Sequence, residues 1–218
     1  GKSKIAKVEG GYHGSHDQVS VSVRTNPAKS GERTRPDSMP ATEGLGEGTL
    51  DQVIVVPFNE TAIAKQRLEE NKDDLAAVII EPMLGSVGML PATSEFLTML
   101  REFTTDNGII LIFDEVISYR AAMGGCQEYY GITPDMTSLG KIIGGGFSIG
   151  AFGGTKSIMD LYDPSQTGGP RVAHAGTFNA NPMTMLAGAA TLDELTPEVY
   201  RELEEMTDYL RAEILKVG

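Results

Sequence analysis

Two short apolar segments separated by one amphipathic segment constrain the fold of this chain more than any other feature. The apolar segments are LAAVIIEP, starting at Leu75, and IILIFDE, starting at Ile109. Both have the length of buried strands. Between them, TSEFLTMLREFTTDNG places apolar residues at helical spacing behind a Thr93 or Ser94 cap. A strand, a helix and a second buried strand predict a parallel sheet.

The same alternation continues along the chain. We expect a helix over residues 60–71, short strands at MTSLG and FSIGAFGG, and helices over about 182–195 and 197–217. The predicted fold is α/β, a mostly parallel sheet with helices on both faces. We assign residues 1–197 to one core, in which residues 18–50, rich in Pro, Gly and charge, form an irregular excursion. Residues 198–218 form a helix that leads out of the core.

Charge and cysteine content narrow the partners. The chain has 18 Lys and Arg against 30 Asp and Glu, a net charge of -12, which opposes binding to nucleic acid or to an anionic membrane. Small molecules or a protein are therefore the expected partners. The single cysteine, Cys126, cannot form an internal disulfide, and no apolar run approaches the roughly 20 residues of a membrane helix, so we expect the cytoplasm.

Chemically active side chains follow the predicted strands. Ligands of parallel sheets bind beyond the carboxyl ends of the strands. Reading the residues that follow each strand gives Glu81, Asp114, Lys141 and the Gly153-Gly154 pair. We expect these groups to converge at one edge of the sheet.

Lys141 is the candidate nucleophile of this edge. Buried among Ile142, Ile143 and glycines, its amine would lose its proton more readily and could attack a carbonyl. It could equally reach solvent or pair with Asp114, which could itself serve as a helix cap. The glycines that follow Lys141 indicate that a ligand approaches the backbone closely.

Two segments are candidates for binding a phosphate group. A P-loop is excluded around Lys141, because Asp135 stands where its first glycine would be. The segment GTFNAN instead offers Gly176 and Thr177 as an anion seat ahead of a helix, or else an ordinary turn capped by Asn179 or Asn181.

The segment YHGSHD has two alternative uses. His13 and His16 resemble metal ligands, but with three histidines in the chain and no supporting Cys or HExxH pattern we expect no metal site. Tyr12 offers an aromatic plane that could stack on a ring, or could pack in the ordinary way.

A lysine nucleophile, a carboxylate for a pyridine nitrogen, an aromatic plane and a phosphate seat together match the needs of pyridoxal phosphate. The chain also resembles the class III aminotransferases of fold type I, most of all the glutamate-1-semialdehyde aminomutase branch. The matching motifs run in order over nearly the whole chain: YHG at Tyr12, IIEPMLGSVGMLP at Ile79, LIFDEV at Leu111, YYGITPDMTSLGKIIGGG at Tyr129 and GTFNANPMTMLAG at Gly176.

The resemblance implies a role for each matching residue. Lys141 would form a Schiff base with the cofactor aldehyde and then move the proton between the substrate and the cofactor. Asp114 would keep the pyridine nitrogen protonated. Tyr12 would stack on one face of the ring and Val116 would pack on the other.

The other residues of the implied cofactor site are His13, Glu81, Ser86, Gly176 and Thr177. Glu81 and Ser86 would lie near the phenolic oxygen of the cofactor, Ser86 standing where the aminomutases carry Asn. Thr177 would reach the cofactor phosphate of the neighbouring subunit, so the resemblance implies a homodimer.

The resemblance leaves three functions open. The loop DEVISYR is one residue shorter than in the aminomutases and, with FSIGAFGG and GTFNANPMTM, more closely resembles the β-amino-acid aminotransferases of the same branch. That resemblance implies amino-group transfer from a β-amino acid or related amine to a keto acid. The alternatives are a glutamate-1-semialdehyde aminomutase and a non-catalytic fragment that binds the cofactor or dimerises. Family members are about twice as long, so we expect this chain to be the central part of the large domain, without the N-terminal phosphate loop and the C-terminal small domain.

Overall fold

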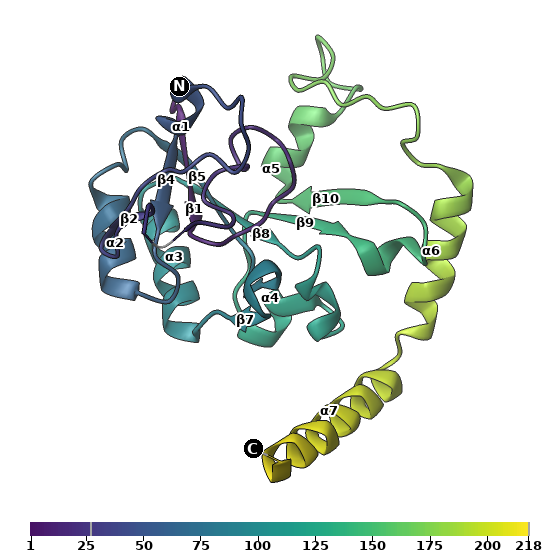
Figure 1. Cartoon of the computed structure of the whole chain (residues 1–218). Helices are drawn as coiled ribbons and strands as arrows, with labels where there is room; N and C mark the ends of the chain where they lie inside the picture. The colour runs from purple at the N-terminus through teal and green to yellow at the C-terminus, as the bar shows by residue number, and fades with distance from the viewer. Residues whose placement is uncertain (27, 218) are drawn as a thin grey trace.

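The computed structural model describes residues 1–26 and 28–217. Its centre is a six-stranded sheet, which Figure 1 shows, in the order β10 (Gly150–Gly154), β9 (Met136–Gly140), β8 (Ile110–Asp114), β5 (Leu75–Ile80), β1 (Lys4–Val8), β4 (Val53–Val56). All neighbouring pairs are parallel except β9 with β10. The predicted α/β class and mostly parallel sheet are confirmed.

Helices lie close to their predicted positions. The long ones are α2 (Thr61–Glu69), α3 (Ser94–Asp106), α6 (Pro182–Glu194) and α7 (Pro197–Val217). The short ones are α1 (Glu47–Leu50), α4 (Gly125–Tyr130) and α5 (Lys156–Met159). Two small hairpins complete the set, β2 (Gly31–Glu32) with β3 (Arg35–Pro36) and β6 (Met83–Leu84) with β7 (Leu90–Pro91).

The main core lies between the sheet and helices α2 and α3. Thr93 caps α3, its side chain accepting a hydrogen bond from the Phe96 amide at 3.2 Å, as the sequence predicts. This start directs Phe96, Leu97 and Leu100 inward, where they are fully buried against the strands. Helix α3 thereby forms the crossover that makes β5 and β8 parallel.

The opposite face of the sheet is covered near β1 and β4 by the excursion of residues 18–50. A second apolar cluster there contains Val21, Val53 and Val55. Backbone hydrogen bonds hold the excursion in place, from the Gly10 amide to the Ser22 carbonyl at 2.8 Å and from the Ser22 amide to the Met39 carbonyl at 2.7 Å. The excursion is therefore packed on the strand ends, although it contains little regular structure.

Strand β10 runs against the other five because residues 141–149 are too few for a parallel crossover. Its register pairs Gly150 with Gly140, and Gly154 with Met136. The Gly153-Gly154 pair therefore lies beside the beginning of β9, away from Lys141. The prediction that these two glycines share an edge with Asp114 and Lys141 is wrong.

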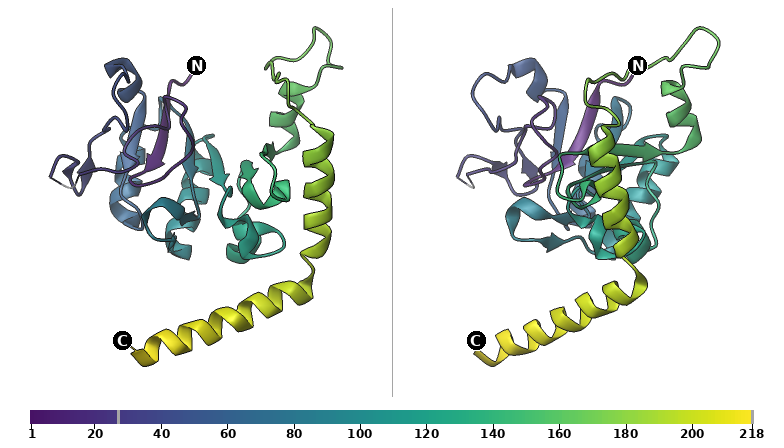
Figure 2. Two further views of the ribbon diagram at one scale, coloured as in Figure 1. Left: turned by 45° about the vertical axis from the view of Figure 1, so that its right-hand side comes forward. Right: turned by 90° about the vertical axis from the view of Figure 1, so that its right-hand side faces the viewer.

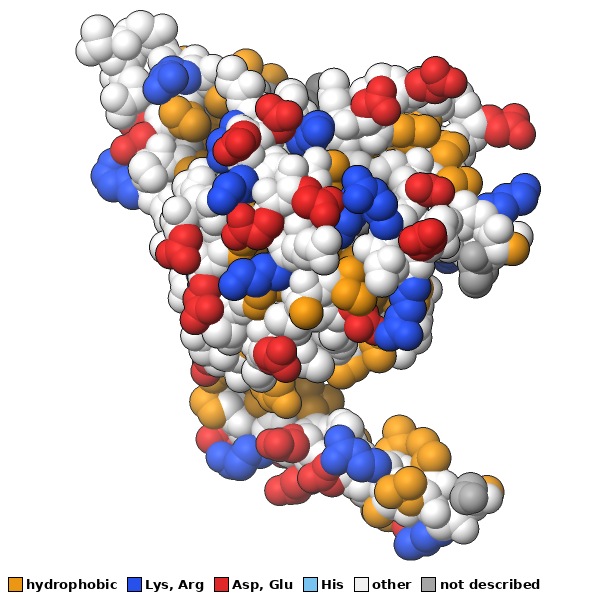
Figure 3. All heavy atoms as spheres, turned by 90° about the vertical axis from the view of Figure 1, so that its left-hand side faces the viewer, with side chains coloured by type: hydrophobic (Ala, Val, Ile, Leu, Met, Phe, Trp, Pro, Cys, Tyr) orange, Lys and Arg blue, Asp and Glu red, His pale blue; other side chains and the backbone are white. Residues whose placement is uncertain are grey.

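Helix α7 projects away from the sheet, as Figures 1 and 2 show, and none of its residues is buried. Its exposed apolar residues are Met206, Tyr209, Leu210, Ile214, Leu215 and Val217. Apolar side chains on this helix are visible in Figure 3, below a body on which acidic and basic side chains are interspersed. Among the described residues, no helix is both long and apolar enough to cross a membrane.

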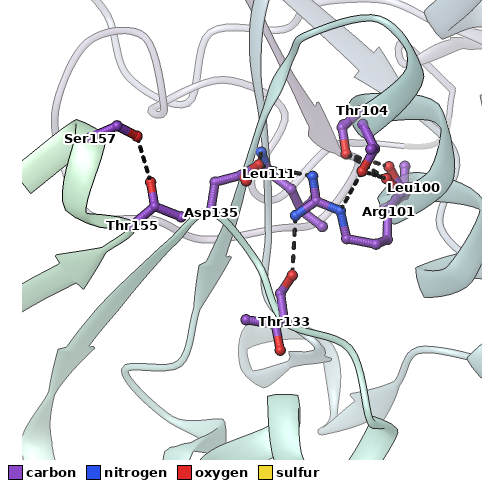
Figure 4. Close-up of polar contacts among 9 residues, drawn as sticks. Leu100, Arg101, Thr104, Leu111, Thr133, Asp135, Thr155 and Ser157 are labelled. Atoms are coloured by element: carbon purple, nitrogen blue, oxygen red, sulfur yellow. Dashed lines mark hydrogen bonds and ion pairs between the residues drawn. The ribbon is translucent and has the colours of Figure 1, made fainter.

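Asp135 fixes the start of β9 against β8 and α3 (Figure 4). One carboxylate oxygen accepts hydrogen bonds from the Leu111 amide at 2.8 Å and from the Arg101 guanidinium at 3.0 Å. Arg101 also donates to the Thr133 carbonyl at 3.1 Å. Asp135 therefore orders the loop that leads into the strand ending at Lys141.

We expect Asp135→Ala to lower the free energy of unfolding by about 1–3 kcal/mol, because the Leu111 amide and the Arg101 guanidinium both lose their acceptor. Urea unfolding followed by circular dichroism measures the change. Asp160→Ala, which removes an exposed ion pair with Lys156, is the matched control and should change little. Equal effects of the two substitutions would contradict this role.

Candidate active site

Strand register places two buried carboxylates side by side. Ile79 of β5 pairs with Ile112 of β8, and two residues further along each strand stand Glu81 and Asp114. Side chains alternate along a strand, so both acids point to the face opposite the main core. Both are nearly inaccessible, at 3% and 6% exposure. The predicted convergence of the two acids is thus found.

Asp114 is held by hydrogen bonds on both oxygens. Oδ2 lies 2.9 Å from His13 Nδ1, and Oδ1 accepts from the Val116 amide at 3.1 Å. The other ring nitrogen of His13, Nε2, is buried and has no hydrogen-bond partner among the described residues. A carboxylate only accepts, so Nδ1 carries the proton and donates to Asp114. Lone pairs of Asp114 remain for a further donor.

Glu81 ties two loops to this acid pair. Its Oε1 accepts from the Tyr12 amide at 2.7 Å, and its Oε2 accepts from the Gly85 amide at 3.1 Å. Gly85 opens the short 3₁₀ turn η1 (Gly85–Val87), which carries the partly exposed Ser86. Tyr12 is exposed at 46%. One buried carboxylate thus positions both Tyr12 and the turn of Ser86.

Lys141 follows β9, three positions beyond Ser138, the register partner of Asp114. It begins the 3₁₀ turn η3 (Lys141–Gly144) in the left-handed region, with φ +50°. Its side chain is exposed, so the expected burial among Ile142 and Ile143 is not found. The reason is geometric, because Ile143 turns into the packing against α6 while Lys141 stands past the strand end.

Val116 lies against the backbone that leads into Lys141. A Cβ built on Gly140 would stand 3.3 Å from Val116 Cγ1. Because Val116 also donates its amide to Asp114, it links the carboxylate to the lysine-bearing strand. Val116 therefore lies beside Asp114 and beside Gly140, the residue that precedes Lys141.

One of the glycines after Lys141, Gly145, serves helix packing. A Cβ on Gly145 would overlap the carbonyl oxygen of Ala187, and a Cβ on Gly188 would overlap that of Ile143. Helix α6 and turn η3 thus meet backbone to backbone. At Gly145 the expected approach of a ligand is wrong, because α6 occupies that space. A Cβ on Gly146 would meet nothing within 4 Å, so there the expectation stays a prediction.

We expect Gly188→Ala to lower the free energy of unfolding by about 1–3 kcal/mol, because the new methyl group has no space against Ile143. In a urea titration the variant should therefore unfold at a lower concentration than the wild type. The sign is diagnostic, since alanine in a helix interior otherwise stabilises by about 1 kcal/mol relative to glycine. Gly153→Ala, whose Cβ would meet nothing within 4 Å, is the control. A stabilised Gly188→Ala variant would contradict the close packing.

Gly176 and Thr177 lie apart from the acid pair. They belong to an exposed turn ahead of α6, in which the Asn179 amide donates to the Gly176 carbonyl at 3.1 Å. Asn181 caps α6 by accepting from the Met183 and Thr184 amides. Within the described part of the chain, no hydrogen bond joins this turn to Asp114. The structure therefore does not bring the predicted phosphate seat and the acid pair together.

A cavity of about 850 Å³ lies on the reverse face of the sheet. Leu139 and Ala151, which pair across β9 and β10, both line it. Leu139 alternates with Ser138 and Gly140, so it points away from the face that carries Asp114. The cavity lies beside α6 and does not contain the acid pair.

Two buried charged residues escape a reading of the sequence. Glu115, fully buried next to Asp114, accepts hydrogen bonds from the Cys126 amide, the Ser118 hydroxyl and the Gln127 side chain. Burial raises the pKa of the Cys126 thiol to about 11.

Lys7, also fully buried, lies on the acid-pair face. The sequence signal for Lys7 is a single charged residue inside the otherwise apolar stretch of a strand.

The histidines do not form a metal cluster with acidic residues. Among the described residues, no group of three or more His, Cys, Asp or Glu side chains is arranged to hold a metal ion. His13 is instead engaged with Asp114.

The site therefore consists of a buried, hydrogen-bonded carboxylate and an exposed lysine that follows the adjacent strand. In a comparison with known families, the family model described as aminotransferase class III matches residues 1–218. The chain belongs to the class III aminotransferase family.

Individual relatives carry two kinds of name. The chain is 44% identical over 218 residues to a glutamate-1-semialdehyde 2,1-aminomutase of Methanosarcina acetivorans, covering 99% of this chain and 49% of that protein. It superimposes on an omega-transaminase from Sphaerobacter thermophilus with TM-score 0.94 and 46% identity, covering 100% of this chain and 50% of the other.

A second solved structure, a β-phenylalanine aminotransferase from Variovorax paradoxus, gives TM-score 0.79 and 40% identity. The match covers 97% of this chain and 44% of the aminotransferase. The chain therefore spans about half the length of the relatives it matches.

Proposed function

We propose that this chain carries the central part of a pyridoxal phosphate site for amino-group transfer. The observation that supports it most is the Asp114 carboxylate, which His13 and the Val116 amide hold in place. The neighbouring strand, β9, leads directly to Lys141. The donor set fits the cofactor, because Asp114 keeps lone pairs for a pyridine N–H and Lys141 offers an exposed amine.

Each residue has a physical task in this proposal. When bound, pyridoxal phosphate supplies an aldehyde that condenses with amines and a ring that accepts electrons. Asp114 holds the proton on the pyridine nitrogen, and the Nδ1–H of His13 keeps the carboxylate oriented. Lys141 would hold the cofactor through its aldehyde carbon, with loss of water, and its amine would carry a proton to or from the substrate carbon. Tyr12 and Val116 would contact the ring.

The remaining proposed contacts are to the phenolic oxygen and the phosphate of the cofactor. We propose that Glu81 and Ser86 lie near the phenolic oxygen. Glu81 accepts a hydrogen bond from Gly85 and so fixes the turn that carries Ser86. Gly176 and Thr177 lie on an exposed turn, and we propose that they reach the cofactor phosphate of a second subunit in a homodimer. The cytoplasmic compartment inferred from the single cysteine stays a prediction.

The first test is covalent trapping on Lys141. Adding pyridoxal phosphate should produce a visible absorption band, and borohydride followed by peptide mapping should place the label on Lys141. Lys141→Ala should abolish the band, while Lys156→Ala, which removes an exposed lysine on α5, should leave it unchanged. A label scattered over surface lysines would contradict the proposal and favour a fragment without cofactor function.

For the substrate, we propose a β-amino acid or related amine as amino donor to a keto acid. The shorter DEVISYR loop and the likeness to the β-phenylalanine aminotransferase support this donor. The second candidate, glutamate-1-semialdehyde aminomutase, is supported by the 44% identity to the archaeal relative. The site residues named above are compatible with both reactions.

Half-reactions distinguish the two. We expect β-phenylalanine to bleach the absorption band of the loaded chain and release a keto acid in stoichiometric amount, and pyruvate to restore the band. Glutamate-1-semialdehyde should give no isomerised product. Isomerisation of the semialdehyde without release of a keto product would instead establish the aminomutase, and no reaction with either substrate would favour a chain that binds the cofactor without turnover.

A further inference from the structure

Lys7 is a buried cation that the proposed chemistry does not use. It lies in β1 with none of its surface exposed, beside the apolar cluster of Val21, Val53 and Val55. Taking an ammonium out of water is costly unless hydrogen bonds and opposite charge compensate it. A residue retained in such a place needs a reason beyond packing.

Hydrogen bonds account for part of the compensation. Lys7 Nζ donates to the Val21 carbonyl at 2.6 Å and to the Val8 carbonyl at 3.2 Å. The first bond fixes the excursion to β1. Both acceptors are neutral, so the positive charge itself must be balanced by other groups.

Two carboxylates supply the balancing charge. Burial lowers the pKa of Lys7 to about 8, while the charges of Glu81 and Glu9 act in the opposite direction, Glu81 more strongly. Glu9 is engaged by the Thr25 hydroxyl at 2.9 Å. Of the two carboxylates, Glu81 therefore acts more strongly on the Lys7 charge, although it forms no direct ion pair with Lys7.

Register shows why the two charges interact. Lys7 pairs with Ile79, which precedes Glu81 by two positions, so Lys7 and Glu81 project from the same face of adjacent strands. Glu81 uses its two oxygens for the Tyr12 and Gly85 amides. A charged carboxylate binds such amides about twice as strongly as a neutral acceptor.

We infer that Lys7 is a positioning residue of the proposed cofactor site: its ammonium balances the Glu81 carboxylate, which in turn holds the Tyr12 and Gly85 peptides in place. The inference rests on the proposed function only in that the positioned residues, Tyr12 and Gly85, would serve the cofactor site. The contacts themselves belong to the chain without cofactor. Without Lys7, the Glu81 carboxylate would stay buried without the charge that acts on it from β1, and it would hold the two amides less firmly.

Amide hydrogen exchange of the cofactor-free chain tests the inference by a double-mutant cycle. In Lys7→Met and in Glu81→Gln, the Tyr12 and Gly85 amides should exchange roughly tenfold faster than in the wild type, and the double variant no faster than Glu81→Gln alone. Lys4→Met, on the same strand but partly exposed, is the matched control. Independent, additive effects of the two substitutions would overturn the inference.

Folding of the variants provides a second criterion. If Lys7→Met does not fold, the double variant Lys7→Met/Glu81→Gln should fold, because it removes the unbalanced carboxylate together with the cation. Failure of both would mean that Lys7 acts through its own packing, which overturns the inference.

Cofactor binding then separates this inference from the proposed function. Lys7→Met should weaken the apparent affinity for pyridoxal phosphate by roughly tenfold, and by much less in the Glu81→Gln background. A non-additive exchange cycle in a wild type that binds no pyridoxal phosphate would overturn the proposed function alone. Additive exchange in a wild type labelled on Lys141 would overturn the Lys7 inference alone.

Discussion

Everything at the candidate site depends on the in-register pairing of parallel strands. With β1, β5 and β8 aligned, alternation of side chains sends one set of residues into the core under α2 and α3 and the other set to the opposite face. Lys7, Glu81 and Asp114 belong to the second set. A slip of one residue in any strand would move its charged group into the apolar core, so the charges themselves oppose a change of register.

The same rule separates two neighbouring acids. Asp114 faces the site and keeps acceptor capacity, whereas Glu115 turns toward the beginning of α4 and is fully engaged by amide and hydroxyl donors. Adjacent carboxylates thereby avoid sharing one environment, which would disfavour ionisation of both. Glu115 thus orders the loop before α4, while Asp114 keeps acceptor capacity on the opposite side.

Much of this arrangement could be predicted from the sequence. The apolar runs, the Thr93 cap and the strand-end acids are local signals, and the structure agrees with each. Three features were not local. The direction of β10 depended on the length of the loop before it. The role of Gly145 depended on Ala187 of α6, 42 residues later in the chain. The exposure of Lys141 depended on where the turn directed Ile143. Pairing across distant segments decides such features, and residue type alone does not.

The left-handed backbone of Lys141 has a consequence for how this position tolerates change. A side chain with a Cβ pays about 1–2 kcal/mol in that conformation, while glycine adopts it freely. Lysine is therefore one of the less stable choices for the turn, and a chain optimised only for folding would lose it. Under the proposed function, this turn gives up some stability to hold an amine at a fixed place. A substitution such as Lys141→Gly would then stabilise the turn while removing the amine that the proposal requires.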